Sequence, residues 1–379
     1  MRLSEIIGHK HLKTHFIQSI DAGRIPHAQL FVGSEGSGTL PMAIAYAQYL
    51  LCKDNEACNL KVESFSHPDL HFAFPVTTSK RVKSKPVSKF FIEEWRKLIK
   101  EQPYGNLFDW YKILEVENKQ GLISVEEAHE IVKSLSLKSY EGGYKIMVIW
   151  MAEKMNAACA NKLLKLIEEP LEKTVFILIA ENEEQIINTI RSRCQTIHFP
   201  PLSEEDITKA IIKNYQLEEN KAKKIAHQSN GNYNKACDLV YNDSEDLLFE
   251  EWFVLWVRSA FKAKGNKAAI HDLITWSESV AKTGRETQKK FLGFCLNYFR
   301  QALLLNYSVE ELVFIEPKVE KFKLENFAPF IHNGNILGIS EEIEQAIYHV
   351  ERNGNPRLIF TDLSIKLTRL LHKKSQANT

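Results

Sequence analysis

The stretch Gln29-Leu-Phe-Val-Gly-Ser-Glu-Gly-Ser-Gly-Thr-Leu40 decides the fold of this 379-residue chain. Its first four residues form an apolar run that is typical of a strand covered on both faces. Gly33, Gly36 and Gly38 follow, and a helix-patterned segment, Leu40–Leu51, comes next. A strand, a glycine-rich turn and a helix in this order form the setting in which backbone N–H groups wrap phosphates.

Two more apolar runs, Lys145–Trp150 and Thr174–Ala180, have the same character as the first. Helical patterns at Val125–Leu137 and Asn156–Ile167 separate them. Because strands that alternate with helices form parallel sheets, we expect a doubly wound α/β domain.

That domain is expected to end near Pro200-Pro201, because Ser203 and the acidic residues after it form a helix start. The predicted domains are an α/β core at 1–202, a small helical lid at 203–242 and an all-helical domain at 243–379. The helices predicted in the last domain are Leu247–Lys262, Ala268–Ala281, Thr287–Asn306, Ser340–Val350 and Leu358–His372.

Composition narrows the class of protein. The 49 Lys and Arg residues nearly balance the 48 Asp and Glu residues, and a net charge of +1 argues against a chain that neutralises many phosphates alone. No apolar run reaches the roughly 18–20 residues of a membrane span, and the amino terminus has no signal-peptide pattern. The six scattered cysteines predict a reduced, cytoplasmic protein.

The glycine loop lacks the residues that handle a metal-bound triphosphate. Thr39 stands where a phosphate loop needs Lys, and Leu40 stands where it needs the Ser or Thr hydroxyl that holds Mg²⁺. A turn that merely joins a strand to a helix is the alternative interpretation. We expect Leu40 to pack against the protein interior.

A second ATPase element has also lost its charges. The strand Ile146–Ile149 ends in Trp150-Met151, where active enzymes place carboxylates that orient Mg²⁺ and water. Glu153 comes three or four positions too late to replace them. We therefore predict no ATP hydrolysis, no tight nucleotide binding and no bound cofactor.

Several blocks together resemble the clamp-loader subunits of the AAA+ superfamily. They are Arg24–Phe31, Asn161–Pro170, Arg191–Cys194, the short His67-Pro-Asp69 and, more weakly, Glu351–Leu358. The resemblance covers residues 1 to about 240 and implies an AAA+ core of the phosphate-loop type. It also implies that the carboxy-terminal domain is an oligomerising collar.

The resemblance implies a place in a pentameric loader that opens a ring-shaped sliding clamp and puts it on primed DNA. Together with the altered loop, the resemblance implies a rigid, non-hydrolysing subunit that sits between the clamp-opening subunit and the motor subunits. No polymerase carboxylate site is recognisable, so any polymerase activity would belong to the holoenzyme.

The motif Ser192-Arg193-Cys194 implies, by the same resemblance, an arginine finger that reaches the ATP of a neighbouring motor subunit. A planar, permanently charged guanidinium can stabilise the charge on a transferring phosphoryl group. The alternative is that Arg193 or Arg191 is a surface arginine that caps the helix starting near Glu183.

Departures from the family lie near the cysteines and in the lid. Many loader subunits bind zinc through four cysteines before the His67 block, whereas this chain offers only Cys52 and Cys58 there. Two thiolates do not complete a tetrahedral site, and His67 and His71 do not follow a known ligand spacing. We expect no metal and two free thiols. In the lid, Asn234, followed by Lys235, takes the place of a nucleotide-sensing Arg.

Two segments are left with open interpretations. The segment 77–118 is either a solvated insertion or a nucleic-acid or partner contact, because it carries Lys80, Arg81, Lys83, Lys85 and Lys89. The apolar group Trp252, Phe253, Leu255 and Trp256 is either a collar contact or part of the domain core.

Two other functions remain as alternatives. An active ATPase motor predicts hydrolysis by the isolated chain, which the replaced loop and strand residues disfavour. A stand-alone DNA-binding scaffold predicts tight, salt-sensitive DNA binding without partners, which the near-neutral charge disfavours.

Overall fold

The computed structural model describes residues 1–116, 119–140, 143–241, 244–315 and 317–373, and the chain divides into two compact units. The first contains Met1–Val116 and Gln120–Val240, and the second consists mainly of the residues from Tyr241 onward. The predicted boundary at residue 202 lies inside the first unit, so the division into three domains stays a prediction.

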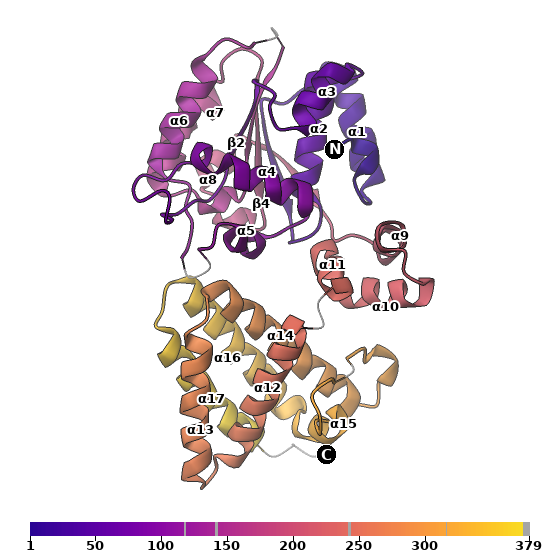
Figure 1. Cartoon of the computed structure of the whole chain (residues 1–379), viewed down its shortest axis with the longest axis vertical. Coiled ribbons are helices and arrows are strands. Elements are labelled where there is room, and N and C mark those ends of the chain that lie inside the picture. The colour runs from indigo at the N-terminus through magenta and orange to yellow at the C-terminus, as the bar shows by residue number, and fades with distance from the viewer. Residues whose placement is uncertain (117–118, 141–142, 242–243, 316, 374–379) are drawn as a thin grey trace. The chain divides into compact units, whose positions relative to one another are not determined.

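Five parallel strands form one sheet in the order β2-β3-β4-β1-β5 (Figure 1). The strands are β1 (Ala28–Gly33), β2 (Leu70–Ala73), β3 (Lys145–Ile149), β4 (Thr174–Ala180) and β5 (Gln195–Phe199). The central strand is β4; β1 lies between β4 and β5, and Leu30 is opposite both Leu178 and Thr196. The predicted α/β fold class is confirmed.

The two edge strands, β2 and β5, are absent from the sequence prediction. β2 has four residues, of which the middle two are only half-buried. In β5 the exposed Gln195 and His198 interrupt the buried Ile197 and Phe199. Neither edge strand therefore contains the continuous apolar run that marks the three inner strands.

Helices cover both faces of the sheet because alternate strand residues point to opposite sides. Phe31 and Ile177 belong to one apolar cluster, and their neighbours Leu30 and Phe176 belong to another. The first cluster includes residues of α1 (Lys10–Asp21), α2 (Thr39–Cys52), α3 (Glu56–Glu63), α4 (Ile92–Glu101) and α5 (Leu107–Ile113). The second includes residues of α6 (Val125–Ser136), α7 (Ala157–Glu168) and α8 (Asn188–Arg191). Figure 1 shows α6 and α7 on one side of the sheet and α1 and α2 on the other.

The solvated-insertion interpretation of the segment 77–118 agrees with residues 77–86, none of which is buried, but was wrong for residues 87–116. It contains the 3-10 helix η2 (Ser88–Phe91) together with α4 and α5. Trp95 and Trp110 are fully buried, and Trp95 stacks on Phe74 with ring centroids 4.2 Å apart. The segment joins the main core because its apolar residues recur at helical spacing among charged ones. Residues 117–118 lie outside the described residues.

The basic cluster in this segment is partly neutralised by glutamates of the same chain. Lys80 lies 3.6 Å from Glu115, and Lys89 lies 2.7 Å from Glu130. Arg81 pairs with Glu94 at 3.2 Å. These ion pairs reduce the charge that the cluster presents to a nucleic acid.

Three helices of the first unit follow the sheet: α9 (Glu204–Tyr215), α10 (Glu219–Ser229) and α11 (Tyr233–Tyr241). The predicted start of α9 is confirmed, because the Ser203 hydroxyl accepts a hydrogen bond from the Asp206 N–H at 3.1 Å. Ile207, Ile211 and Ile225 form a small apolar cluster of their own. We call residues 203–240 the lid.

The second unit is helical in its described part, as predicted. Its α-helices are α12 (Ser244–Lys262), α13 (Lys267–Ala281), α14 (Arg285–Asn306), α15 (Leu324–Phe327), α16 (Asn333–Glu351) and α17 (Pro356–Leu371). Besides η2, the described residues of both units contain the short 3-10 helices η1 (Leu3–Glu5), η3 (Ala152–Lys154), η4 (Glu183–Gln185), η5 (Glu310–Leu312) and η6 (Ala328–Phe330). None of the helices in the described ranges combines the length and the apolar content that a membrane crossing requires.

The apolar group on α12 divides between core and surface. Phe253 and Trp256 are fully buried, and Trp252 packs partly buried against the same cluster. Trp256 stacks on Trp276 and donates its indole N–H to the Ser364 hydroxyl at 2.9 Å. Leu255 is 51% exposed. The core interpretation therefore holds for the aromatic members, and Leu255 alone of the four faces outward.

Candidate functional site

The glycine loop has the backbone of a phosphate loop. β1 ends at Gly33 and α2 begins at Thr39. Gly36 and Gly38 have φ values of 68° and 95°, which side-chain-bearing residues rarely adopt. The Ser37 N–H donates to the Ser34 carbonyl at 3.1 Å and closes the turn. The loop geometry that the sequence predicts is therefore present.

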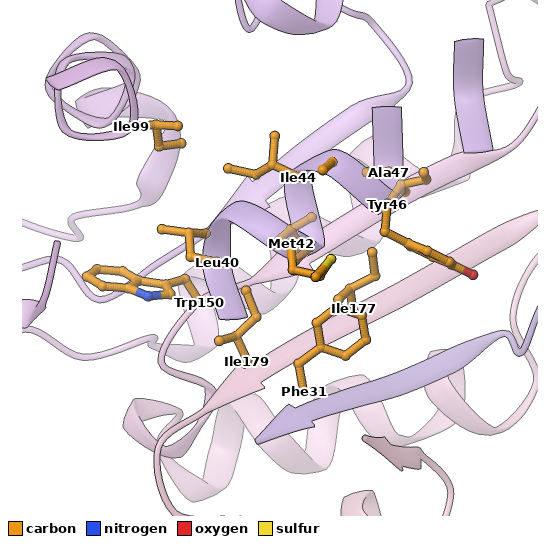
Figure 2. Close-up of a cluster of buried hydrophobic side chains, with 14 of the residues drawn as sticks. Phe31, Leu40, Met42, Ile44, Tyr46, Ala47, Ile99, Trp150, Ile177 and Ile179 are labelled. Carbon is orange, nitrogen blue, oxygen red and sulfur yellow. The ribbon is translucent and has the colours of Figure 1, made fainter. Parts of the chain in front are cut away.

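The side chains at the working positions are packed into the core. Leu40 is 3% exposed, Trp150 is 3% exposed and Met151 is 5% exposed, and all three belong to one apolar cluster. Figure 2 shows Leu40 beside Trp150 and Ile179. A magnesium ion that enters this site would lose water ligands, and the side chains of Leu40, Trp150 and Met151 offer no oxygen atoms to replace them. Burying the ion without such partners is very costly.

Little room remains above the loop. The pocket there has a cavity volume of about 20 Å³, enough for a water molecule and far too small for a triphosphate. It is lined by the loop residues Gly33–Glu35, Gly36 and Gly38–Pro41, by Pro103–Asn106, by Trp150 and Met151, and by Ile179–Glu181. The carboxylates among these residues, Glu35 and Glu181, would repel a phosphate.

Glu153 does not line this pocket. Its carboxylate accepts a hydrogen bond from the Glu181 N–H at 3.0 Å, directly after β4. Burial raises the pKa of Glu153. The structure thus uses Glu153 to tie η3 to the end of β4.

Asn234 is buried at the start of α11, where its side-chain amide donates to Asp109 Oδ2 at 2.8 Å. The residue at the predicted sensor position therefore binds another part of its own chain. Three residues near the loop were missed by sequence reasoning, namely Tyr104, Asn106 and Asn232. They come from the insertion and the lid, and no motif marks them.

Arg193 lies in the short connection between α8 and β5. Its Nη1 donates to the Thr189 carbonyl at 2.9 Å, and its Nη2 lies 2.9 Å from Glu168 Oε1. The side chain is 35% exposed. Burial raises the pKa of the neighbouring Cys194 thiol to about 11. Thr189 belongs to α8, which begins at Asn188 and is separate from the 3-10 helix at Glu183–Gln185. The exposure leaves the guanidinium within reach of another molecule.

The sheet keeps Arg193 away from the glycine loop. Arg193 precedes the first residue of β5, Gln195, which pairs with Gln29 near the start of β1. The loop follows the other end of β1, where Gly33 pairs with Phe199. Since the strands are parallel, Arg193 lies at their amino-terminal ends and the loop lies at their carboxyl-terminal ends. This arginine therefore cannot serve the chain's own loop.

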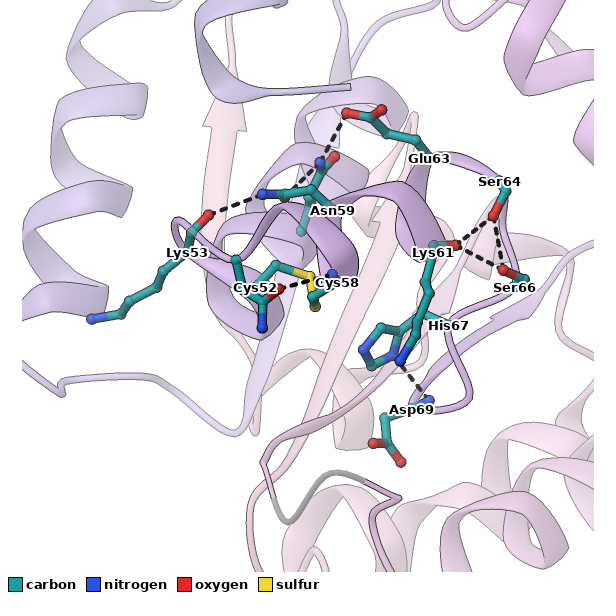
Figure 3. The surroundings of a disulfide bond; sticks show 12 residues. Cys52, Lys53, Cys58, Asn59, Lys61, Glu63, Ser64, Ser66, His67 and Asp69 are labelled. Atoms are coloured by element: carbon teal, nitrogen blue, oxygen red, sulfur yellow. Dashed lines mark hydrogen bonds between the residues drawn. A yellow bond between two sulfur atoms is a disulfide. The ribbon is translucent and has the colours of Figure 1, made fainter.

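The expectation of two free thiols at Cys52 and Cys58 was wrong, because they form a disulfide (Figure 3). α2 ends at Cys52, a tight turn follows, and Asn55 caps α3 by accepting from the Cys58 N–H. This turn brings the two Cα atoms to 5.3 Å, within the usual range for a disulfide.

The potential ligand atoms of Cys52, Cys58 and His67 lie within 4.8 Å of one another. His71 is not part of this group. Three donors are one short of a closed tetrahedral zinc site, and bonded sulfurs cannot act as thiolates. In this disulfide form the residues do not fit the zinc site that the family implies.

Comparison with known proteins identifies the family. The family model described as DNA polymerase III, delta subunit, matches residues 8–203, which is just over half of the chain. A DNA polymerase III subunit delta' of Bacillus subtilis is 29% identical over 232 residues, covering 59% of this chain and 57% of the relative. The subunit delta' of Yersinia pestis is 39% identical over 90 residues, covering 24% of this chain and 26% of the relative.

A DNA polymerase III subunit gamma of Buchnera aphidicola is 27% identical over 241 residues, covering 62% of this chain and 57% of the relative. The chain thus spans less than two thirds of the length of these curated relatives. The matched region contains the glycine loop, the sheet and Arg193. The chain belongs to the DNA polymerase III delta subunit family, and within it resembles the delta prime subunits.

Proposed function

We propose that this chain is a delta prime subunit that acts as a stator in the clamp loader of DNA polymerase III. It neither binds nor hydrolyses ATP, because its degenerate phosphate loop is closed. The observation that carries this proposal is the cavity of about 20 Å³ above the loop, walled by Leu40, Trp150 and Met151. An active motor subunit would need that space and a cation in it.

On this proposal, the partners are the tau/gamma motor subunits and the delta subunit, and the complex brings the chain to the sliding clamp and primed DNA. Arg193 is the arginine finger given to one motor subunit. Its partial exposure and its distance from the chain's own loop support a role in trans. Fingers of this kind accelerate hydrolysis about 10³–10⁵-fold where they act.

Reconstitution of the loader tests the finger. Loaders are assembled with the wild-type chain, Arg193→Ala, Arg193→Lys or Arg191→Ala, and clamp- and DNA-stimulated single-turnover ATP hydrolysis is followed. We expect Arg193→Ala to abolish the share of the burst that comes from the neighbouring site. Arg193→Lys should retain little of that share, because an ammonium group lacks the planar, two-pronged geometry of a guanidinium. The matched control Arg191→Ala should keep the full burst.

Size-exclusion chromatography establishes that each loader has assembled. A full burst from an assembled Arg193→Ala loader would remove the finger assignment. A direct test of the loop uses the isolated chain with Mg²⁺ and a fluorescent ATP analogue. Binding at micromolar concentration would contradict the closed pocket.

A further inference from the structure

The connection between α4 and α5, residues 102–106, is held rigidly against the core. Trp110, just beyond it, is fully buried and donates its indole N–H to the Pro75 carbonyl at 2.7 Å. Asn106 and Asp109 cap α5 reciprocally, with each side chain 2.9 Å from the other's backbone N–H. The connection therefore has one defined position, and four of its residues line the pocket above the glycine loop.

Tyr104 covers the glycine at the start of α2. A methyl group added to Gly38 would lie 3.0 Å from Tyr104 Cε1, so the ring rests directly on the loop. The Tyr104 hydroxyl accepts a hydrogen bond from the Ile7 N–H at 2.9 Å, and burial raises its pKa. Loop glycines are where phosphate oxygens approach backbone N–H groups. The ring therefore occupies the approach that a phosphate would take.

The same connection and the lid share one carboxylate of the loop. Glu35 Oε1 accepts from the Asn106 amide at 2.7 Å and from the Asn232 amide at 3.2 Å. Gly36 lies so close to the lid that an added Cβ would meet Asn232 Oδ1 at 1.9 Å. The lid thus touches the loop at two successive residues.

Two further contacts complete the connection between the lid, the loop and the insertion. The Tyr233 N–H donates to the Gly36 carbonyl at 3.1 Å, and Asn234 binds Asp109 as described above. The rings of Tyr233 and Tyr104 meet edge to face with centroids 4.9 Å apart. Tyr104 therefore contacts the amino terminus, the loop and the lid at once.

We propose that the connection at residues 102–106 is a built-in occupant of the altered phosphate loop, which locks the lid to the core without any nucleotide. This gives the insertion a function that the family resemblance does not supply. It rests on the loss of nucleotide binding in the proposed function but not on the role of Arg193. Core and lid then move as one body in every nucleotide state of the loader.

Hydrogen exchange of the full chain, followed by mass spectrometry, tests the lock. In the wild-type chain, peptides that cover 33–42 and 230–236 should exchange slowly, and Mg·ATP should not change their rates. Tyr104→Ala should raise exchange in both peptides at least tenfold and leave the α7 peptide unchanged. Tyr140→Ala removes a tyrosine that is 76% exposed and should leave all three peptides unchanged.

A second variant guards against a folding defect in Tyr104→Ala. Asn234→Ala removes the bond between the lid and Asp109 and keeps the ring, so it should raise exchange only in the 230–236 peptide. Wild-type exchange rates in both variants would overturn the lock and leave the proposed function intact. Protection of the wild-type loop by Mg·ATP would instead overturn the loss of nucleotide binding, and the lock with it.

Discussion

Arg193 and Glu168 form an ion pair, 2.9 Å between Nη2 and Oε1, that joins the start of β5 to the end of α7. The side chains are 35% and 52% exposed, so the pair contributes at most about 1 kcal/mol to stability. Together with the Thr189 carbonyl it fixes two of the guanidinium's nitrogens. The remaining N–H groups can then bind an incoming anion without a search through rotamers.

The ion pair predicts a phenotype for Glu168→Gln. Because the amide holds the guanidinium less firmly, single-turnover hydrolysis in the reconstituted loader should fall, though less than with Arg193→Ala. The melting temperature of the chain should stay within 1–2 °C of wild type, as expected for about 0.5 kcal/mol or less. The neighbouring Glu169→Gln is the matched control. A wild-type hydrolysis rate for Glu168→Gln would show that the pair does not position the finger.

Restoring the Lys and the hydroxyl residue of the phosphate-loop motif should not restore ATP binding. Thr39→Lys combined with Leu40→Thr places a cation and a hydroxyl at the usual positions, but Tyr104, Trp150 and Met151 still fill the space. Leu40 is buried, so the double variant should lose about 2–4 kcal/mol of unfolding free energy in urea. Thr39→Lys alone, at a half-buried position, should lose much less. Micromolar binding of a fluorescent ATP analogue by the double variant would contradict this account.

The buried carboxyl of Glu127 should make the free energy of unfolding fall as the pH rises. Burial raises the pKa of its carboxyl from 4.5 to about 7, although the Ser88 N–H donates to it at 2.6 Å. The folded chain therefore keeps a proton between about pH 4.5 and 7 that the unfolded chain releases, and this stabilisation is lost through that window. Glu127→Gln should raise the melting temperature at pH 8 and have little effect at pH 5.

Glu126→Gln serves as the control for this pH dependence. The pKa of Glu126 is lowered, chiefly by a backbone hydrogen bond, so its loss should not stabilise the chain at pH 8. Equal pH profiles of melting temperature for the wild-type chain and Glu127→Gln would show that the buried carboxyl does not titrate in this range.

The Cys52–Cys58 disulfide closes a short loop of six residues' separation. Loop-closure entropy for so short a loop corresponds to about 2 kcal/mol. Dithiothreitol should lower the unfolding free energy by about that amount and should not affect the Cys52→Ser, Cys58→Ser double variant. Alkylation of the denatured, unreduced chain should label the four free cysteines. Six labels before reduction would exclude the disulfide.

The sequence predicted those elements whose pattern is local. The strands at β1, β3 and β4 are continuous apolar runs, and the helix start at Ser203 has a capping pattern that needs no distant partner. β5 was missed because an edge strand alternates polar and apolar residues. The disulfide was missed because a spacing of six residues gives no distance until the turn between α2 and α3 is known.

Thr39, Leu40, Trp150 and Met151 stand at positions that a motif fixes, so the sequence alone predicts a loss of charge there. The sequence did not predict which side chains fill the space above the glycine loop. Glu35 and Asn232 are 197 positions apart in the chain, and Tyr104 comes from an insertion without a motif. These contacts depend on the burial of Trp95 and Trp110. The sequence did not indicate that burial, because charged residues surround both tryptophans.

The opposite placement of Arg193 and the glycine loop gives this subunit a direction. In a row of like-folded subunits on the proposed role, the amino-terminal ends of each sheet's strands offer a guanidinium and the carboxyl-terminal ends accept one from a neighbour. This chain can then only donate a guanidinium, since the pocket at the carboxyl-terminal ends of its own strands is filled by side chains. It would therefore stand at the terminus of a series of ATP sites and could not be inserted between two working motors without silencing one of them.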